Sequence, residues 1–158
     1  MTERRKVRTC LWFDTQAEEA ARFYVSLLPG SRIETVSRPD PHGAVAVVDF
    51  ELAGTPYMAL NGGPHFTHSP AASIHVLTEE QEETDRLWTH LPEGGGAESM
   101  RGWLTDRFRV SWQIVPERLV EMTEAPDRET AARVREAMLE MKKIEIATLE
   151  AAFRGEGD

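Results

Sequence analysis

A few polar side chains inside apolar, strand-like runs are the residues of this chain best suited to chemistry. His75, Asn61 and Gln113 each lie in such a run or at its end. Histidine titrates near neutral pH, so His75 is the best candidate for a general acid or base, with His65 or Asp14 as possible helpers. A catalytic metal needs at least three deprotonated donors at one point, and these residue types supply few of them.

Other catalytic motifs are missing from the sequence. No Ser-His-Asp order is visible, and Gly94-Gly95-Gly96 follows a predicted helix instead of a strand, so it lacks the setting of a nucleotide-binding loop. Cys10 is the single cysteine and cannot form an intramolecular disulfide. Because Cys10 adjoins Leu11 and Trp12, we expect a buried, inert thiol.

The segment from Leu11 to Arg38 contains the signals for a strand, a helix and a second strand. Thr15 precedes Glu18 by three residues, the spacing of a capping box, which predicts a helix over about residues 16–28. Pro29-Gly30 ends this helix. Apolar residues 10–13 predict a buried strand before it, and further strands are expected over residues 32–37, 44–52 and 55–61. The first half is therefore strand, helix, strand, strand, strand.

The same signals return 63 residues later. Thr78, Gln81 and Pro92 match Thr15, Glu18 and Pro29 at that offset. This match indicates an internal duplication, in which His75 corresponds to Trp12. The apolar residues 73–77 predict the first strand of the second copy, and residues 102–106 and 110–115 predict a later pair.

Beyond Pro116 the periodicity becomes helical. Val134, Met138 and Met141 recur at four- and three-residue spacing in a tail rich in Ala and Glu. These helices either pack on their own domain or contact a second subunit, and the sequence leaves both alternatives open.

The composition of the chain indicates its cellular location and which partners are excluded. The chain has 158 residues, 18 Lys and Arg against 27 Asp and Glu, and a formal net charge of -9. That balance argues against nucleic acid as a partner. No apolar run approaches the roughly 20 residues that span a bilayer, and the first residues lack the apolar core of a signal peptide. We expect a cytoplasmic protein without a membrane partner, folded as a single domain over residues 1–158.

The duplicated pattern resembles the paired βαβββ architecture of the vicinal oxygen chelate superfamily, which includes glyoxalases, extradiol dioxygenases and bleomycin-resistance proteins. Three blocks are similar to its PhnB-like branch, also called demethylubiquinone methyltransferase-like domains: LWFDTQAEEAARFYVSLLPGSRI, FELAGTPYMALNGGPHF and GWLTDRFRVSWQIVP. The resemblance extends over residues 7–152, including the tail segment AMLEMKKIEIATLEAA. It implies an α+β fold with two curved mixed sheets, a first module over 7–61, a second over 71–115 and a helical extension over 117–153. Arg109 departs from the pattern, because relatives commonly carry glycine there, which puts a left-handed turn in doubt.

In this superfamily the site lies inside the cups formed by the two modules. The resemblance therefore implies a ligand-binding set on strands or strand ends: Trp12, Phe50, Asn61, His75, Trp103 and Gln113. Alternation along a strand places Trp112 and Gln113 on opposite faces, and the resemblance favours Gln113 as the inward one. Metalloenzymes of the superfamily draw His or Glu ligands from the first and last strands of both modules. Here Trp12 and Gln113 occupy two such positions, so we expect neither a metal nor another cofactor.

Three functions remain open at this point. The leading hypothesis is a homodimeric, metal-free protein that binds a small, partly aromatic or polar molecule. The second is a lyase, isomerase or dioxygenase of the same superfamily with His75 as metal ligand or base. The third is a structural partner module without a ligand. Whether the protein is an enzyme is left undecided by the sequence.

Overall fold

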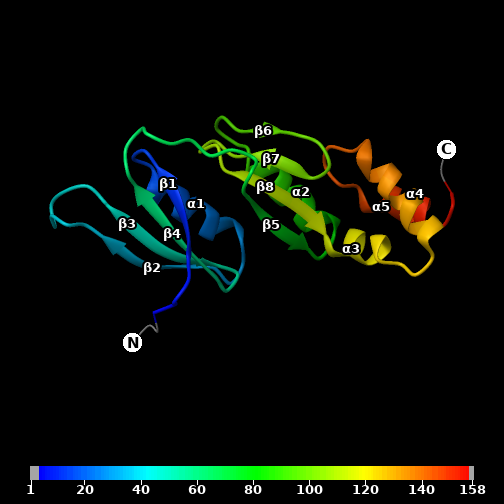
Figure 1. Cartoon of the computed structure of the whole chain (residues 1–158), viewed down its shortest axis with the longest axis horizontal. Coiled ribbons are helices and arrows are strands. Elements are labelled where there is room, and N and C mark those ends of the chain that lie inside the picture. Colours follow the sequence, from blue (N-terminus) through cyan, green and yellow to red (C-terminus); the bar gives the residue numbers. More distant parts are fainter. Residues whose placement is uncertain (1–3, 157–158) are drawn as a thin grey trace. The chain divides into compact units, whose positions relative to one another are not determined.

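The computed structural model describes residues 4–156, which contain two modules of the same topology followed by three helices (Figure 1). The first module comprises β1 (Thr9–Phe13), α1 (Ala17–Leu27), β2 (Arg32–Ser37), β3 (Val47–Leu52) and β4 (Thr55–Asn61). The second comprises β5 (Ser73–Thr78), α2 (Gln81–His90), β6 (Ala97–Glu98), β7 (Trp103–Thr105) and β8 (Ser111–Pro116). The last helices are α3 (Glu117–Thr123), α4 (Arg128–Leu139) and α5 (Ile146–Phe153).

The two modules have the same strand order. It is β1-β4-β3-β2 in the first sheet and β5-β8-β7-β6 in the second. The pairs β1·β4 and β5·β8 are parallel, and the other pairs are antiparallel. The predicted α+β fold with paired βαβββ modules and C-terminal helices is therefore confirmed. The chain divides into two compact units, Met1–His68 and Ser69–Asp158.

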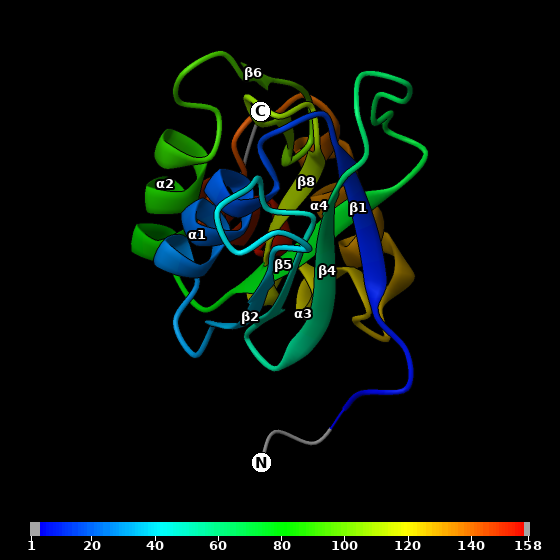
Figure 2. The ribbon, with the colours of Figure 1, turned by 90° about the vertical axis from the view of Figure 1, so that its left-hand side faces the viewer.

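In the first unit, helix α1 covers one face of its sheet (Figure 2). Val48, Phe50 and Leu52 alternate along β3 and are buried together with the α1 residues Ala20 and Tyr24. Their alternation follows from the two-residue period of a strand, which sends every second side chain to the same face. The residues between them, including Asp49 and Glu51, belong to the opposite face of the sheet.

Helix α1 is not capped as the sequence predicts. Gln16 is its N-cap residue and makes no side-chain cap bond, so the expected Thr15–Glu18 capping box does not form. Instead the Ala17 backbone N–H donates to Oδ1 of Asn61 at 2.8 Å. A residue at the end of β4 therefore satisfies a free amide of the first turn, which a local spacing rule cannot anticipate.

Helix α2 also differs from its predicted start. Its N-cap is Glu80, whose carboxylate accepts from the Glu83 N–H at 3.0 Å. Thr78 is buried and its hydroxyl bonds that of Thr84 at 2.7 Å, which joins β5 to the inner face of α2. The N-cap position therefore goes to a local carboxylate, one that also suits the positive end of the helix dipole.

The C-terminal helices pack within their own chain. Leu119, Met122, Val134, Ile144 and Leu149 form one buried apolar cluster, with Met138 and Met141 partly buried against it. Figure 1 shows α4 and α5 side by side at this end of the second unit. The apolar periodicity of the tail is thus accounted for by packing on its own domain. None of the described helices has the length and apolarity needed to cross a membrane.

Candidate functional site

Three of the predicted site residues form one row across the second sheet. His75 on β5 is the register partner of Gln113 on β8, and Gln113 is in turn the partner of Trp103 on β7. Thr78 faces α2, so alternation places His75 on the opposite face. We call this face, away from α2, the open face of the second module. His75 is exposed, whereas Gln113 and Trp103 are half-buried.

The corresponding row of the first module has different chemistry. Trp12 on β1 pairs with Leu60 on β4, and Leu60 pairs with Val47 on β3. The equal strand order of the two sheets makes this row the counterpart of His75, Gln113 and Trp103. The two copies thus share a framework, but only the second presents polar groups along the row.

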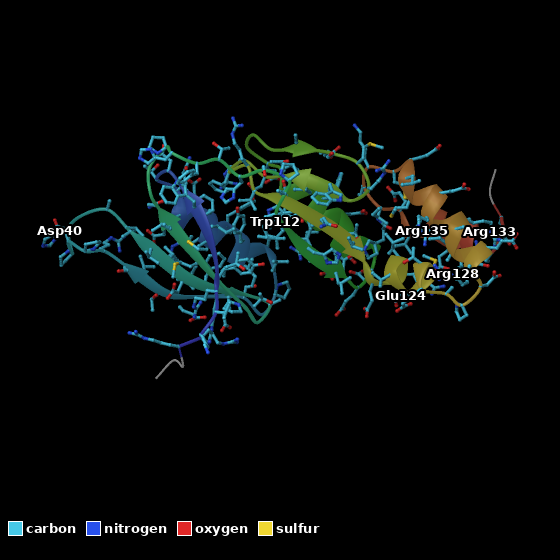
Figure 3. All side chains as sticks on the ribbon, in the orientation of Figure 1. Asp40, Trp112, Glu124, Arg128, Arg133 and Arg135 are labelled. Atoms are coloured by element: carbon cyan, nitrogen blue, oxygen red, sulfur yellow. The ribbon has the colours of Figure 1, made fainter. Side chains whose placement is uncertain are left out.

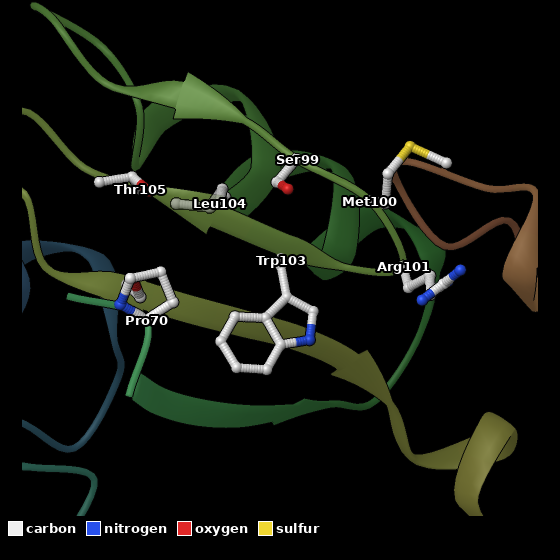
Figure 4. A pocket seen from close by; sticks show the side chains of 8 residues that line it. Pro70, Ser99, Met100, Arg101, Trp103, Leu104 and Thr105 are labelled. Atoms are coloured by element: carbon white, nitrogen blue, oxygen red, sulfur yellow. The ribbon is translucent and has the colours of Figure 1, made fainter. Parts of the chain in front are cut away.

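A hollow of about 350 Å³ opens beside Trp103 (Figure 4). Its lining consists of Pro70, Ser99, Met100, Arg101, Trp103, Leu104, Thr105 and Ser111. Trp103 and Thr105 share a face of β7 because they are two residues apart. The hollow therefore combines an indole ring with three hydroxyl groups and one guanidinium, the mixture of apolar surface and few polar groups found in small-molecule sites.

Gln113 and Trp112 divide between the two faces as alternation predicts. The Gln113 side-chain amide donates to Oγ of Ser73 at 2.8 Å on the open face. Trp112 is fully buried, and its indole N–H donates to Oδ2 of Asp106 at 2.9 Å. Figure 3 shows Trp112 within the second module. The choice of Gln113 as the inward residue is consistent with this geometry.

Arg101 is a lining residue that the sequence analysis missed. Its backbone has a φ of 60°, a left-handed conformation that is costly for any residue except glycine. The Arg101 N–H donates to the Met141 carbonyl and the Gly102 N–H to the Lys142 carbonyl, both at 2.7 Å, so the α4–α5 connection fixes this turn. The signal available in the sequence was the pair Arg101-Gly102 directly before a predicted inward tryptophan.

The predicted site residues of the first unit have structural partners of their own. The Trp12 indole N–H donates to the Gly63 carbonyl at 2.9 Å, and the ring meets Phe66 edge-on at 4.9 Å between centroids. A Cβ on Gly62 would collide with this indole, so only glycine fits there. Asn61, besides accepting from Ala17, donates to the Val45 carbonyl at 3.0 Å.

Phe50 differs from the expectation that it lines a cup. It is fully buried on the α1 side of the first sheet, stacked on Tyr57 with ring centroids 5.6 Å apart. The nearly continuous apolar run 44–52 conceals the alternation that separates Phe50 from the open positions of β3. Phe50 therefore belongs to the core of the first module.

Cys10 is exposed, so the prediction of a buried thiol is wrong. Its position on β1, next to the apolar Leu11, places it on the face opposite the helix. Partial burial raises the pKa of the Cys10 thiol, and the nearby Asp49 carboxylate raises it further. A raised pKa leaves less thiolate at neutral pH, so Cys10 remains a poor nucleophile.

Arg109 occupies a left-handed turn despite its side chain, with a φ of 73°. Asp106 stabilises the turn, because its Oδ1 accepts from the backbone N–H groups of Phe108 and Val110 at 2.8 and 3.0 Å. The left-handed turn that was in doubt therefore forms with arginine in place of glycine.

The donor set does not fit a catalytic metal of the kind found in the superfamily's enzymes. Within residues 4–156, no three His, Cys, Asp or Glu side chains form a group that could hold an ion. His75 has an amide and an indole as its row neighbours, and its counterpart in the first module is the indole of Trp12. We therefore derive no chemical step through a metal.

Comparison with known proteins identifies the family. The model of the 3-demethylubiquinone-9 3-methyltransferase family matches residues 5–115, which is more than half of the chain. The chain belongs to this family. The predicted PhnB-like, demethylubiquinone methyltransferase-like branch is confirmed by this match and by the PhnB protein described next. The match ends just before α3, so the C-terminal helices lie outside it.

Solved structures agree with the family match. A putative 3-demethylubiquinone-9 3-methyltransferase, PhnB protein, from Bacillus cereus is 35% identical, with a TM-score of 0.65 over 71% of this chain and 99% of that chain. Protein PA1353 from Pseudomonas aeruginosa is 23% identical and shares the fold, with a TM-score of 0.61 over 72% of this chain and 98% of that one. No curated protein matches the chain.

The family's methyltransferase name implies a methyl-donor cofactor, and this PhnB-like chain lacks the usual cradle for one. Such a site requires a Gly-rich turn after the first strand of a parallel sheet. Here β1 ends at Phe13 and continues through Asp14-Thr15-Gln16 into α1, and β1 belongs to a mixed sheet. The residues present do not fit that cofactor, and we assign it no role.

Proposed function

We propose that this PhnB-like protein binds a small, partly planar organic molecule on the open face of its second module, without a metal. The observation that carries the proposal is the half-buried indole of Trp103 lining a hollow of about 350 Å³. An aromatic wall offers a large contact area to a planar ligand, and a few polar groups fix its orientation.

The polar groups beside the indole support this proposal. Ser99, Thr105 and Ser111 bring hydroxyl groups to the hollow. Gln113, the register partner of Trp103, does not line the hollow but lies on the same face, with its side-chain nitrogen bonded to Ser73. His75 completes the row and is exposed to an incoming ligand. The alternative of a metal-dependent lyase, isomerase or dioxygenase lacks a donor set on this face.

Fluorescence titration tests the proposal with N-phenyl-1-naphthylamine, a neutral aromatic probe that brightens in apolar surroundings. Trp103→Ala should weaken binding at least tenfold, because it removes the aromatic wall. Phe66→Ala is the matched control, since Phe66 is an exposed aromatic residue of the first unit, 68% exposed. Equal binding by Trp103→Ala and the unmodified protein would contradict the proposed site.

We also propose a homodimer, now on the family resemblance alone, because the apolar residues of the tail are buried within the chain. Light scattering at micromolar concentration should give twice the chain mass of 17.8 kDa. A monomeric mass would contradict this expectation. A cytoplasmic location stays a prediction, which cell fractionation can test.

A further inference from the structure

The open face of the second module carries no carboxylate on its strands. By register, the described strand residues on this face are Ser73, His75, Leu77, Ala97, Trp103, Thr105, Ser111, Gln113 and Val115. The chain as a whole has 27 Asp and Glu residues, so a face without any carboxylate on its strands is unusual for this protein. In the first module the corresponding face carries Asp49 and Glu51 on β3. There Glu51 is paired with Arg5 and Arg32. On this face of the second sheet, an anion meets no carboxylate of the described strands at all.

Arg101 places a positive charge at the rim of this neutral face. Among residues 4–156, no carboxylate forms an ion pair with it. Its Nε donates to the Leu139 carbonyl at 3.3 Å, and the two terminal nitrogens of the guanidinium have no acceptor within the described part of the chain. Those two nitrogens form the fork with which arginine holds planar anionic groups.

The backbone of Arg101 holds the side chain in place. The left-handed φ of 60° is strained for arginine, and two backbone bonds to the α4–α5 connection maintain it. Strained positions that the surrounding structure maintains are concentrated at ligand-binding sites. Arg101 and Trp103 both line the hollow, and Figure 4 shows Arg101 on the side of the indole nitrogen. A ring against Trp103 can therefore place an attached anionic group at Arg101.

We propose that the ligand of this hollow is a planar organic anion, with its ring against Trp103 and its charged group held by Arg101. The inference rests on the proposed function and adds the charge class of the ligand. The hydroxyl groups of Ser99, Thr105 and Ser111 are further donors for the anionic oxygens.

A matched pair of probes tests the charge. 8-Anilino-1-naphthalenesulfonate and N-phenyl-1-naphthylamine share one ring system, and only the first carries a sulfonate. The full-length protein should bind the anionic probe at least fivefold more tightly than the neutral one. Arg101→Gln should abolish this preference, so that the anionic probe binds no more tightly than the neutral one. Arg101→Gly is the second variant, because its backbone suits the left-handed turn and so keeps the fold.

Arg135→Gln is the matched control, since Arg135 is exposed on α4 and is not among the residues that line the hollow (Figure 3). It removes one positive charge and should leave both dissociation constants unchanged. An unaltered preference in Arg101→Gln and Arg101→Gly would overturn the proposal. Equal binding of both probes by the unmodified protein would overturn the proposal that the ligand is an anion, while leaving the proposed function intact. Failure of both probes to bind would count against the proposed function itself and the anion with it.

Discussion

Asn61 acts as a helix cap although it stands on a strand. Its side-chain oxygen accepts from the Ala17 N–H and its side-chain nitrogen donates to the Val45 carbonyl, at 2.8 and 3.0 Å. Both backbone groups lose their partner if the amide is removed. The residue therefore connects the start of α1, the end of β4 and the loop before β3.

Asn61→Ala should lower the free energy of unfolding by about 2 kcal/mol, roughly 1 kcal/mol for each lost bond. Chemical denaturation with an unchanged slope measures the difference. Thr15→Ala is the control, because Thr15 would be the cap if the local sequence signal were correct. Its effect should stay below about 0.5 kcal/mol, as for an ordinary surface change. A larger loss for Thr15→Ala than for Asn61→Ala would contradict the capping role of Asn61.

Single residues are predictable where a period decides their position. Alternation separates Gln113 from Trp112, and the offset of 63 aligns His75 with Trp12. Alternation is hard to recognise around Phe50, because apolar residues occupy nearly every position of the run 44–52. The left-handed conformation of Arg101 could not be predicted, because it depends on backbone bonds that it and Gly102 make to residues 40 positions away.

Among the elements, α2 and the C-terminal helices are joined by one glutamine. The Gln81 side chain donates to the Ile144 carbonyl at 3.0 Å and accepts from the Ile146 N–H at 2.8 Å. The second bond satisfies a free amide at the start of α5, as Asn61 does for α1. The sequence placed Gln81 in a capping box of its own helix, whereas the structure uses it to cap another.

Gln81→Ala should reduce the free energy of unfolding by about 2 kcal/mol for the two lost bonds to Ile144 and Ile146. The third bond, to the partly exposed carboxylate of Asp85, can be replaced by water and should add little. Hydrogen exchange should show the loss of protection mainly in α5, because its first amide loses its acceptor. Glu82→Ala, an exposed change in the same turn of α2, is the control for helix propensity. Unchanged protection of α5 in Gln81→Ala would show that the helix is held by the apolar cluster alone.

Acid should weaken the contact between α3 and α5. Arg118 donates to both carboxylate oxygens of Glu150, at 2.6 and 3.2 Å. These hydrogen bonds hold the pKa of Glu150 below its usual value. A carboxyl whose pKa is lowered by folding stabilises the fold above its unfolded pKa, near 4.3, and loses that contribution as the pH falls through the folded value.

Glu150→Gln should therefore flatten the acid limb of the stability curve between about pH 5 and pH 3. The effect is small and declines with salt, because both side chains are partly exposed. Glu136→Gln, an exposed glutamate of α4, serves as the control. If the free energy of unfolding decreases over this pH range by the same amount in both variants and in the unmodified protein, the ion pair contributes nothing to acid stability.

Element bounds were largely predictable, and the caps were not. The predicted strands 32–37 and 55–61 coincide with β2 and β4. The Ala53-Gly54 turn that joins β3 to β4 has a positive φ at both residues. These features depend on local turn chemistry and composition. The helix starts depend on competition between local and distant acceptors, which only the folded chain decides.

At the scale of the whole molecule, the duplication gives two modules with the same strand order but different side chains on their open faces. The first row is Trp12, Leu60 and Val47, and the second is His75, Gln113 and Trp103. A metal site of this superfamily takes ligands from both modules. Because the first module has an indole at one of these positions, one ligand is missing whatever residues the second module carries. The fold and family were predictable from the repeat together with the three family-like sequence blocks, whereas of the lining of the hollow only Trp103 was predicted.

The purified protein should therefore hold no stoichiometric metal. Elemental analysis after dialysis against zinc, nickel or iron(II) salts and desalting should give well below one ion per chain. The Trp12→His variant introduces a histidine at the counterpart of His75. It therefore tests whether the missing donor at this position is what prevents metal binding. One bound ion per chain in the unmodified protein would contradict a metal-free site.

The two ways of capping α1 and α2 have a consequence for the order in which the modules fold. The Glu80 carboxylate reaches the Glu83 amide within one turn, so α2 has its cap as soon as the turn forms. The acceptor for Ala17 lies 44 residues along the chain, and it arrives only when β4 has paired. Long-range closure is slow because the entropy of the loop is lost before the bond is gained. The second helix can therefore take part in a folding nucleus, while the first helix gains its full stability late, after its sheet has formed.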